Sequence, residues 1–244
     1  MWQELRNELH PLGLEIVTVG LDTLGADACR PFIEAARPEH PSLIDAHHTV
    51  AQLFGVINIP NSLWIDEYGH IVRPAEFSPP PRRIERPPRA ASTAPVSERA
   101  LGMAAEAAKI RYDSGPYHAA LRDWVELGAA SEFALAPDDV IERSRPRDAD
   151  AARGHAHFEL ATQLELQGHH DAAVLHFREA QRLVPDNFSY KRQAWSLEPG
   201  PAGPVGRFWQ GPADDHPEAW PYDSDWLSEV TEMGGENYYP EWKA

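Results

Sequence analysis

The sequence predicts an α/β domain, followed by an all-helical module and an irregular C-terminal tail rich in aromatic residues. Three observations predict this order. The apolar run at 14–20, LEIVTVG, is typical of a strand covered on both faces. Helical periodicity continues from Ser97. Large rings then gather after residue 198. We expect an α/β domain over 1–75, a proline-rich linker over 76–96, a helical module over 97–197 and a tail over 198–244 that packs on the body.

Composition limits the classes of function. The 244 residues include 38 acidic and 22 basic side chains, which gives a formal net charge of −16. This excess of negative charge disfavours broad binding to nucleic acid or to anionic membranes. No long apolar run and no secretory leader are present, and the one cysteine cannot form an internal disulfide. We therefore predict a soluble cytoplasmic protein with no membrane or nucleic-acid partner.

The first half of the predicted α/β domain alternates helices with short apolar segments. Trp2, Leu5 and Leu9 are spaced for one helical face. The expected elements are a helix at Trp2–Leu9, a strand at Leu14–Gly20, a helix over about 26–37, a short apolar segment at 42–45 and a helix at Thr49–Phe54. His47 and His48 start this last helix, and adjacent helical residues point about 100° apart. We expect a solvated pair rather than a chelate.

The most distinctive stretch is 55–73, GVINIPNSLWIDEYGHIVR. It predicts a hairpin with strands at Ser62–Ile65 and His70–Arg73, joined by an acidic turn that contains Gly69. The proline of Ile59-Pro60 precedes the first strand, where its missing N–H is tolerated. This bond is a candidate for the cis isomer, and an ordinary trans entry is the alternative.

These residues resemble a known family. Phe54-Gly55-Val56, Ile59-Pro60, Ser62, Trp64-Ile65-Asp66 and Gly69-His70-Ile71-Val72 are similar to a motif of thioredoxin-like proteins of the redoxin type. That group includes the alkyl hydroperoxide reductase and thiol-specific antioxidant relatives and the cytochrome-maturation thioredoxins. The resemblance covers roughly residues 1–75. It implies a thioredoxin-like fold and a role in thiol-disulfide exchange, antioxidant defence and cell redox homeostasis.

The resemblance also implies features that this chain lacks. In the family, the first core strand leads into a helix that carries Cys-x-x-Cys, and neither precedes the helix at Trp2–Leu9. Either the strand and motif have been lost, or the true protein begins further upstream, which we favour because a sheet without its central strand exposes apolar edges. The family's proline loop receives the substrate chain, which implies Ile59, Pro60 and Asn61 as substrate- or partner-binding residues.

Cys29 is the one thiol of the chain, and it lies early in the predicted helix over 26–37. A helix N-terminus and the neighbouring Arg30 would lower the pKa of a thiol and favour catalysis. The proline and threonine context of a peroxidatic cysteine is absent around it. Cys29 is thus a weak catalytic candidate, and the alternative is a free cysteine without a chemical role.

Residues 97–197 carry helical patterns, and those within 154–187 resemble one tetratricopeptide repeat. Ala161 and Ala173 allow two helices to approach closely, Gly168 allows the turn, Phe177 fills the groove and Pro185 stops the second helix. One repeat cannot bury its apolar face alone, so we expect it to stack on neighbouring helices. The histidines of this repeat are expected at exposed helix ends, without a metal: His155, His157, His169, His170 and His176.

The tail after residue 198 is too rich in rings to be a flexible chain, and we expect it to wrap the body, with 236–240 near the Pro60 loop. Two functions stay open. One is a thiol-disulfide oxidoreductase or antioxidant by resemblance, although without a cysteine pair the exchange reaction cannot run in this chain. The alternative is a non-catalytic module that binds a protein or peptide through the helical repeat and the proline-loop face. Enzymatic activity is left open, and no cofactor is expected.

Overall fold

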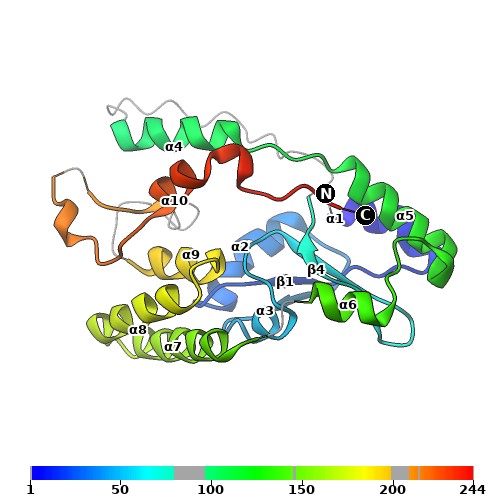
Figure 1. Cartoon of the computed structure of the whole chain (residues 1–244), viewed down its shortest axis with the longest axis horizontal. Helices are drawn as coiled ribbons and strands as arrows, with labels where there is room; N and C mark the ends of the chain where they lie inside the picture. Colours follow the sequence, from blue (N-terminus) through cyan, green and yellow to red (C-terminus); the bar gives the residue numbers. More distant parts are fainter. Residues whose placement is uncertain (1, 80–96, 145–146, 199–208, 214, 244) are drawn as a thin grey trace.

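The computed structural model describes residues 2–79, 97–144, 147–198, 209–213 and 215–243, which form ten α-helices and four short strands (Figure 1). The α-helices are α1 (Trp2–Leu9), α2 (Ala26–Ala36), α3 (Thr49–Phe54), α4 (Glu98–Lys109), α5 (Gly115–Leu127), α6 (Pro137–Arg143), α7 (Ala149–Leu166), α8 (His170–Leu183), α9 (Phe188–Leu197) and α10 (Trp226–Met233). The strands are β1 (Thr18–Gly20), β2 (Ser42–Ile44), β3 (Asn61–Ile65) and β4 (Ile71–Phe77). Short 3-10 helices are η1 (His10–Leu12), η2 (Gly128–Ala130), η4 (Pro217–Ala219) and η5 (Gly235–Asn237).

The strands form two separate sheets of two strands each. β1 pairs with β2 in parallel, and β3 pairs with β4 antiparallel. Across the described ranges no strand joins the two sheets, and 57% of the structure is helical. The prediction of a thioredoxin-like α/β domain over residues 1–75 is therefore wrong, because that domain requires one continuous sheet.

The apolar run at 14–20 shows why the sheet stays small. It forms a strand only at Thr18–Gly20, and its partner β2 begins directly after Pro41. The Thr18 N–H donates to the Pro41 carbonyl at 3.0 Å, but the proline nitrogen has no hydrogen to return. The parallel ladder cannot extend past this point. Val17 and Val19 are exposed, whereas a strand covered on both faces would bury them.

The hairpin at 55–73 is present, and its second strand is longer than predicted. Asn61 pairs with Phe77, and Ile65 pairs with Ile71, with register shifts around Trp64. The Asp66 side chain closes the turn by accepting the N–H groups of Tyr68 and His70 at 3.0 and 2.8 Å. β4 thus continues beyond the expected boundary at residue 75. The predicted linker over 76–96 lies, from residue 80 onward, outside the described residues.

The helices after residue 97 do not form one stack. α4 packs against α10 and η5, and α6 packs against β4. α5 buries Tyr117 and Leu121 in a cluster with Leu5 of α1 and Trp64 of β3. The predicted separate all-helical module is therefore incorrect, because α5 and α6 cover the hairpin and α1 instead of stacking on α7 and α8.

α7 and α8 form an antiparallel helical hairpin with α9 beside it (Figure 1). The packing roles predicted for its small residues are confirmed. Ala161 and Ala173 are fully buried between the helices, and Gly168 turns the chain with a φ of +79°. α8 ends at Leu183, two residues before Pro185. The likeness to a tetratricopeptide repeat stays a prediction, since close-packed helical hairpins occur in many folds.

The predicted irregular tail contains the helix α10 and contributes to the main core. Tyr222, Trp226, Val230 and Tyr238 are buried in the larger hydrophobic cluster together with rings from α7, α8 and α9. The Asp225 side chain caps α10 by accepting the Ser228 N–H at 2.8 Å, which fixes where the helix begins. This segment therefore stabilises the interior, and describing it as an irregular tail was incorrect.

A buried arginine anchors the end of the chain to the hairpin. The Arg73 side chain is 0% exposed and lies against the ring of Trp242, 4.7 Å from its centroid. Its guanidinium donates to the Glu76 carboxylate at 2.5 Å, to the Phe133 carbonyl at 3.2 Å and to the Lys243 carbonyl at 2.6 Å. One charged group thus joins β4, the segment before α6 and the C-terminal residues.

Arg73→Ala is expected to lower the free energy of unfolding by about 3 kcal/mol or more, because it breaks the buried ion pair with Glu76 and leaves the Phe133 and Lys243 carbonyls without this donor. The matched control is Arg122→Ala, whose pair with Glu8 at 2.5 Å is half exposed on both sides. A loss below about 1 kcal/mol is expected there. Urea denaturation followed by tryptophan fluorescence measures both. Equal losses in the two variants would contradict the anchoring role of Arg73.

Candidate functional site

The proline loop lies at the entry to β3. The Ile59-Pro60 peptide bond is cis, as the sequence allowed. The main chain of Ile59 is fully engaged: its N–H donates to the Asn58 side chain at 2.9 Å, and its carbonyl accepts from the Tyr239 hydroxyl at 3.2 Å. The Tyr239 ring stacks on Phe77 with centroids 4.2 Å apart. The predicted approach of residues 236–240 to this loop is confirmed.

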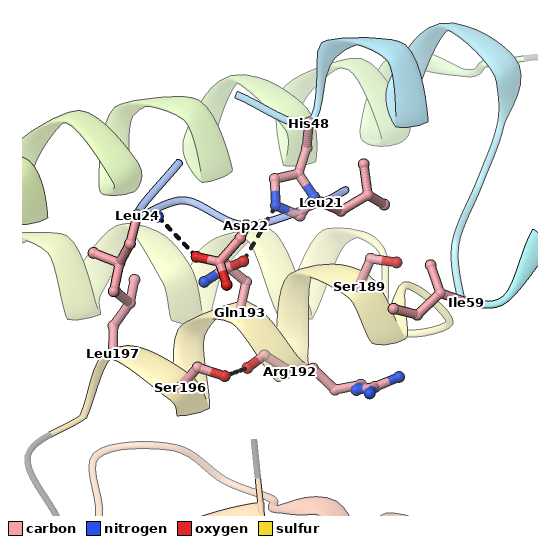
Figure 2. Close-up of a pocket in the computed structure, with 10 residues that line it drawn as sticks. All are labelled: Leu21, Asp22, Leu24, His48, Ile59, Ser189, Arg192, Gln193, Ser196 and Leu197. Atoms are coloured by element: carbon pink, nitrogen blue, oxygen red, sulfur yellow. Dashed lines mark hydrogen bonds between the residues drawn. The ribbon is translucent and has the colours of Figure 1, made fainter. Parts of the chain in front are cut away.

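A pocket of about 140 Å³ opens beside the loop (Figure 2). Four segments build it: the loop between β1 and α2, the residue before α3, the proline loop and one face of α9. Its lining residues are Leu21, Asp22, Leu24, His48, Ile59, Ser189, Arg192, Gln193, Ser196 and Leu197. An apolar cavity of roughly 150 Å³ accepts a molecule the size of benzene, so this volume suits a single side chain better than a large cofactor.

The β1–α2 loop and α9 each contribute both apolar and polar groups to the lining. Leucines of the β1–α2 loop, Ile59 and Leu197 supply the apolar surface. α9 supplies hydroxyl, amide and guanidinium groups, and Asp22 lies opposite them (Figure 2). Asp22 also shapes the loop, because its carboxylate accepts the Leu24 N–H at 2.9 Å. A ligand group in this pocket would therefore meet apolar and hydrogen-bonding groups from both of these segments.

His48 is the least exposed polar residue of the pocket, with 1% of its surface accessible. The Thr23 N–H donates to Gln193 Oε1 at 3.1 Å, which identifies that atom as the amide oxygen. Because this oxygen only accepts, His48 Nε2, 3.4 Å away, carries the hydrogen. The Nδ1 atom is then a lone-pair acceptor. Within the described ranges it has no hydrogen-bond partner.

Burial lowers the pKa of His48 to about 4, although the nearby Asp45 carboxylate acts in the opposite direction. Asp45 cannot pair with the ring directly, since it caps α3 by accepting the N–H groups of Thr49, Val50 and Ala51 at 2.8–3.1 Å. The ring is therefore neutral at neutral pH. It places no positive charge beside the pocket.

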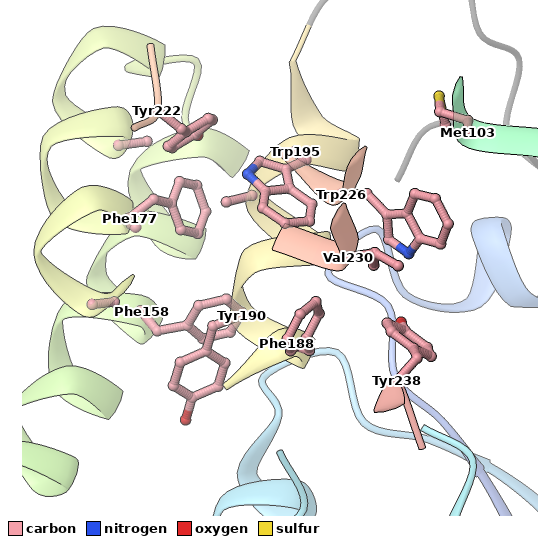
Figure 3. Close-up of a cluster of buried hydrophobic side chains, with 14 residues drawn as sticks. Met103, Phe158, Phe177, Phe188, Tyr190, Trp195, Tyr222, Trp226, Val230 and Tyr238 are labelled. Atoms are coloured by element: carbon pink, nitrogen blue, oxygen red, sulfur yellow. The ribbon is translucent and has the colours of Figure 1, made fainter. Parts of the chain in front are cut away.

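α9 presents the pocket on a rigid support. While Arg192, Gln193 and Ser196 face the pocket, Phe188, Tyr190 and Trp195 of the same helix lie in the main aromatic core (Figure 3). The Tyr190 ring stacks on Phe158 of α7 with centroids 4.0 Å apart and an interplanar angle of 11°. The far side of α9 is thus held by α7, α8 and the C-terminal segment, and the pocket wall is preorganised.

Of the predicted binding residues Ile59, Pro60 and Asn61, the structure places one in the lining of the pocket. Ile59 lines the pocket and is 37% exposed, whereas Asn61 is held in the hairpin by its pairing with Phe77. Pro60 also faces β4, since its carbonyl accepts the Ser78 N–H at 3.4 Å. Of the three residues implied by the family resemblance, Ile59 is the one in position to contact a ligand in this pocket.

Cys29 lies in α2 and is not among the residues that line the pocket. Its sulfur packs against β1, since a side chain placed on Gly20 would meet it at 3.1 Å. Burial, and in addition the negative charge of Asp22, raise the pKa of the Cys29 thiol. This is the opposite of the depressed pKa that an attacking thiol needs. The surroundings of Cys29 therefore do not support catalysis.

Sequence reasoning missed most of the pocket. His47-His48 was expected to be solvated, but His48 is buried because the start of α3 packs against α9. Gln193 is 145 residues away in the chain and has no motif around it. The local signal that was available is the acidic Asp45 shortly before the helix, whose carboxylate accepts the Thr49 N–H, but it does not indicate that His48 is buried.

Comparison with protein-family models, curated proteins and solved structures finds no match. The resemblance to redoxins therefore rests on the motif residues between Phe54 and Val72 alone.

The buried neutral His48 predicts a specific pH dependence. Its folded-state pKa lies below the unfolded value of about 6.5, so the unfolded state binds the proton more tightly, and stability falls as pH drops from about 6.5 towards 4. This histidine alone is expected to remove about 2 kcal/mol between about pH 7 and 5. Comparing urea denaturation of the wild type and His48→Gln isolates that part. An NMR titration showing a His48 pKa near 6.5 would contradict the burial argument.

The raised thiol pKa of Cys29 predicts slow alkylation. At neutral pH iodoacetamide should modify Cys29 more slowly than it modifies N-acetylcysteine, because less of the protein thiol is ionised and access to it is restricted. The rate should rise with pH, and its midpoint should lie above that of the free thiol. A midpoint below neutral pH would indicate an activated cysteine instead.

Proposed function

We propose that this protein is a non-catalytic interaction module that binds one side chain of an extended protein or peptide segment in the pocket beside Ile59. The observation that carries the proposal is the pocket itself, which is preformed, is about 140 Å³ in volume and is lined by both apolar and hydrogen-bonding groups. Such a cavity selects a side chain by size and orients it by hydrogen bonds. A partner side chain up to the size of leucine or phenylalanine suits this volume.

The mode of binding follows from the hydrogen bonds of the loop. Because Asn58 and Tyr239 already satisfy the main chain of Ile59, a partner cannot add itself as a strand at this position without displacing Tyr239. Recognition therefore depends on side-chain contacts in the pocket. The Ser189 hydroxyl and His48 Nδ1 have no hydrogen-bond partner in the described chain, but both atoms are shielded from solvent, so a ligand does not reach them in this conformation.

A thiol-based activity has weaker support. The chain contains one cysteine, and thiol-disulfide exchange through an internal pair requires two. The one thiol is partly buried, has a raised pKa and lies outside the pocket lining. These observations favour binding over the oxidoreductase or antioxidant role that the resemblance implies.

The charge of the chain restricts the partner further. A net charge of −16 disfavours nucleic acid and strongly acidic proteins, and favours a neutral or basic partner segment. No helix in the described residues has the length and apolarity needed to cross a membrane. The single reduced cysteine fits a partner in the cytoplasm, where we place the interaction.

The test begins with selection of binding peptides from a displayed random library on the full chain, followed by affinity measurement. Ile59→Ala should weaken the selected peptide about tenfold, since it removes three carbons from the apolar wall at about 0.8 kcal/mol each when buried, and Ile59 is only partly covered. The matched control is Ile141→Ala on α6, where the same residue type is 71% exposed and lies outside the pocket.

Cys29→Ser separates the two functions. It should leave the peptide affinity unchanged if binding uses the pocket. Loss of binding in Cys29→Ser together with unchanged binding in Ile59→Ala would overturn the proposal and return attention to the thiol.

A further inference from the structure

β1 has one edge that is paired with β2 and one open edge. Parallel strands bond to a neighbour through alternate residues. Towards β2, Thr18 donates its N–H to the Pro41 carbonyl at 3.0 Å, and Gly20 accepts the Asp45 N–H at 2.8 Å. The main-chain groups of the intervening Val19 therefore point away from β2. In the described part of the chain no second strand pairs with β1, so this edge is open to another strand.

The two faces of this small sheet differ. α2 covers the face that carries Gly20, because a side chain placed there would meet the Cys29 sulfur at 3.1 Å. Successive side chains of an extended chain alternate between faces, so Val17 and Val19 lie on the opposite face. They are 52% and 36% exposed, and Leu43, which pairs with Val19, is 55% exposed. An exposed apolar face thus lies beside the open edge.

The open edge leads into the pocket beside Ile59. Leu21 directly follows β1 and lines that pocket (Figure 2). Because it comes two residues after Val19, the alternation of an extended chain places it on the same face as Val17 and Val19. Three apolar side chains therefore follow one another along about 13 Å of chain, at about 3.3 Å per residue, and the last of them is in the pocket.

We propose that the partner segment binds as an added strand along the open edge of β1 and places one of its side chains in the pocket. This inference rests on the proposed function and specifies the partner: an extended segment with apolar residues at positions i, i+2 and i+4. The side chain opposite Leu21 enters the pocket, and the other two cover Val19 and Val17. The positions between them carry polar residues, and the net charge of −16 favours basic ones.

Strand addition is possible at β1 although it is blocked at Ile59. On the Ile59 side of the pocket, Asn58 and Tyr239 occupy the main-chain groups. At β1, the groups of Val17 and Val19 that point away from β2 have no hydrogen-bond partner among the described residues. The partner is thus held by main-chain hydrogen bonds at β1, while the pocket selects its side chain.

The first experiment uses peptides selected from the displayed random library on the full chain. Their sequences should carry apolar residues at alternate positions over about five residues. Methylation of one peptide amide nitrogen at a time should weaken binding about fivefold at every second amide, since each such change removes one main-chain hydrogen bond. The amides between them should be less sensitive. A scan without this alternation would overturn the strand pairing.

The second experiment changes the protein. Val19→Pro removes the N–H that points away from β2 and leaves the bonds to β2 in place, because an edge strand tolerates proline where its N–H faces outward. It should weaken the selected peptide about fivefold. The matched control is Val19→Ala, which keeps the N–H and should weaken binding less. Urea denaturation compares the stability of both variants, and the N-methyl scan decides the question if Val19→Pro does not fold.

The outcomes separate this inference from the proposed function. If Ile59→Ala weakens binding while Val19→Pro and N-methylation have no effect, the strand pairing is overturned and the proposed function stands. If Ile59→Ala has no effect, the proposed function itself is overturned. If sedimentation equilibrium shows a dimer that Val19→Pro converts to a monomer, the open edge belongs to a second copy of the chain, and the inference is overturned.

Discussion

Much of the tertiary structure depends on the burial of one positive charge. The guanidinium of Arg73 has no access to solvent, and it satisfies its hydrogen bonds with Glu76 and with carbonyls from two distant segments. A buried charge without such partners costs several kcal/mol, so those segments have to meet at β4. Trp242 completes the site by stacking on the guanidinium and donating to Glu76 at 2.9 Å. The C-terminal residues are thereby held against the hairpin.

That constraint also determines how the proline loop is presented. Once Trp242 is fixed on Arg73, Tyr239 lies on Phe77 and reaches the Ile59 carbonyl. α10 and Tyr238 then fill the space above α9 and join its rings in the larger core. The pocket is formed between two anchored units, the loop on one side and α9 on the other. Its shape is a consequence of core packing on both sides, which is why it suits recognition without rearrangement.

The groups that line the pocket support the proposed binding role. His48 is held neutral by burial, Gln193 is committed to Thr23 and His48, and Cys29 lies outside the lining with its pKa raised. A nucleophile aligned with a general base is the usual arrangement of a catalytic centre, and none is present among the described residues of the pocket. His157 of α7 and His176 of α8 are hydrogen-bonded to each other at 2.8 Å and lie outside the pocket lining.

The sequence by itself determined the local elements: the hairpin after Ile59-Pro60, the helical hairpin around Gly168 and the burial of Ala161 and Ala173. These elements depend on turn residues, side-chain size and periodicity within about 30 residues, so a short stretch of sequence is enough to predict them. Only the tertiary structure decided the rest. The ladder of β1 and β2 begins only after Pro41, and His48 is buried by a helix 145 residues away. Such contacts arise from packing between segments that carry no local signal for one another. For this reason the expected single sheet was wrong, and of the histidine pair expected to be solvated only His47 is exposed.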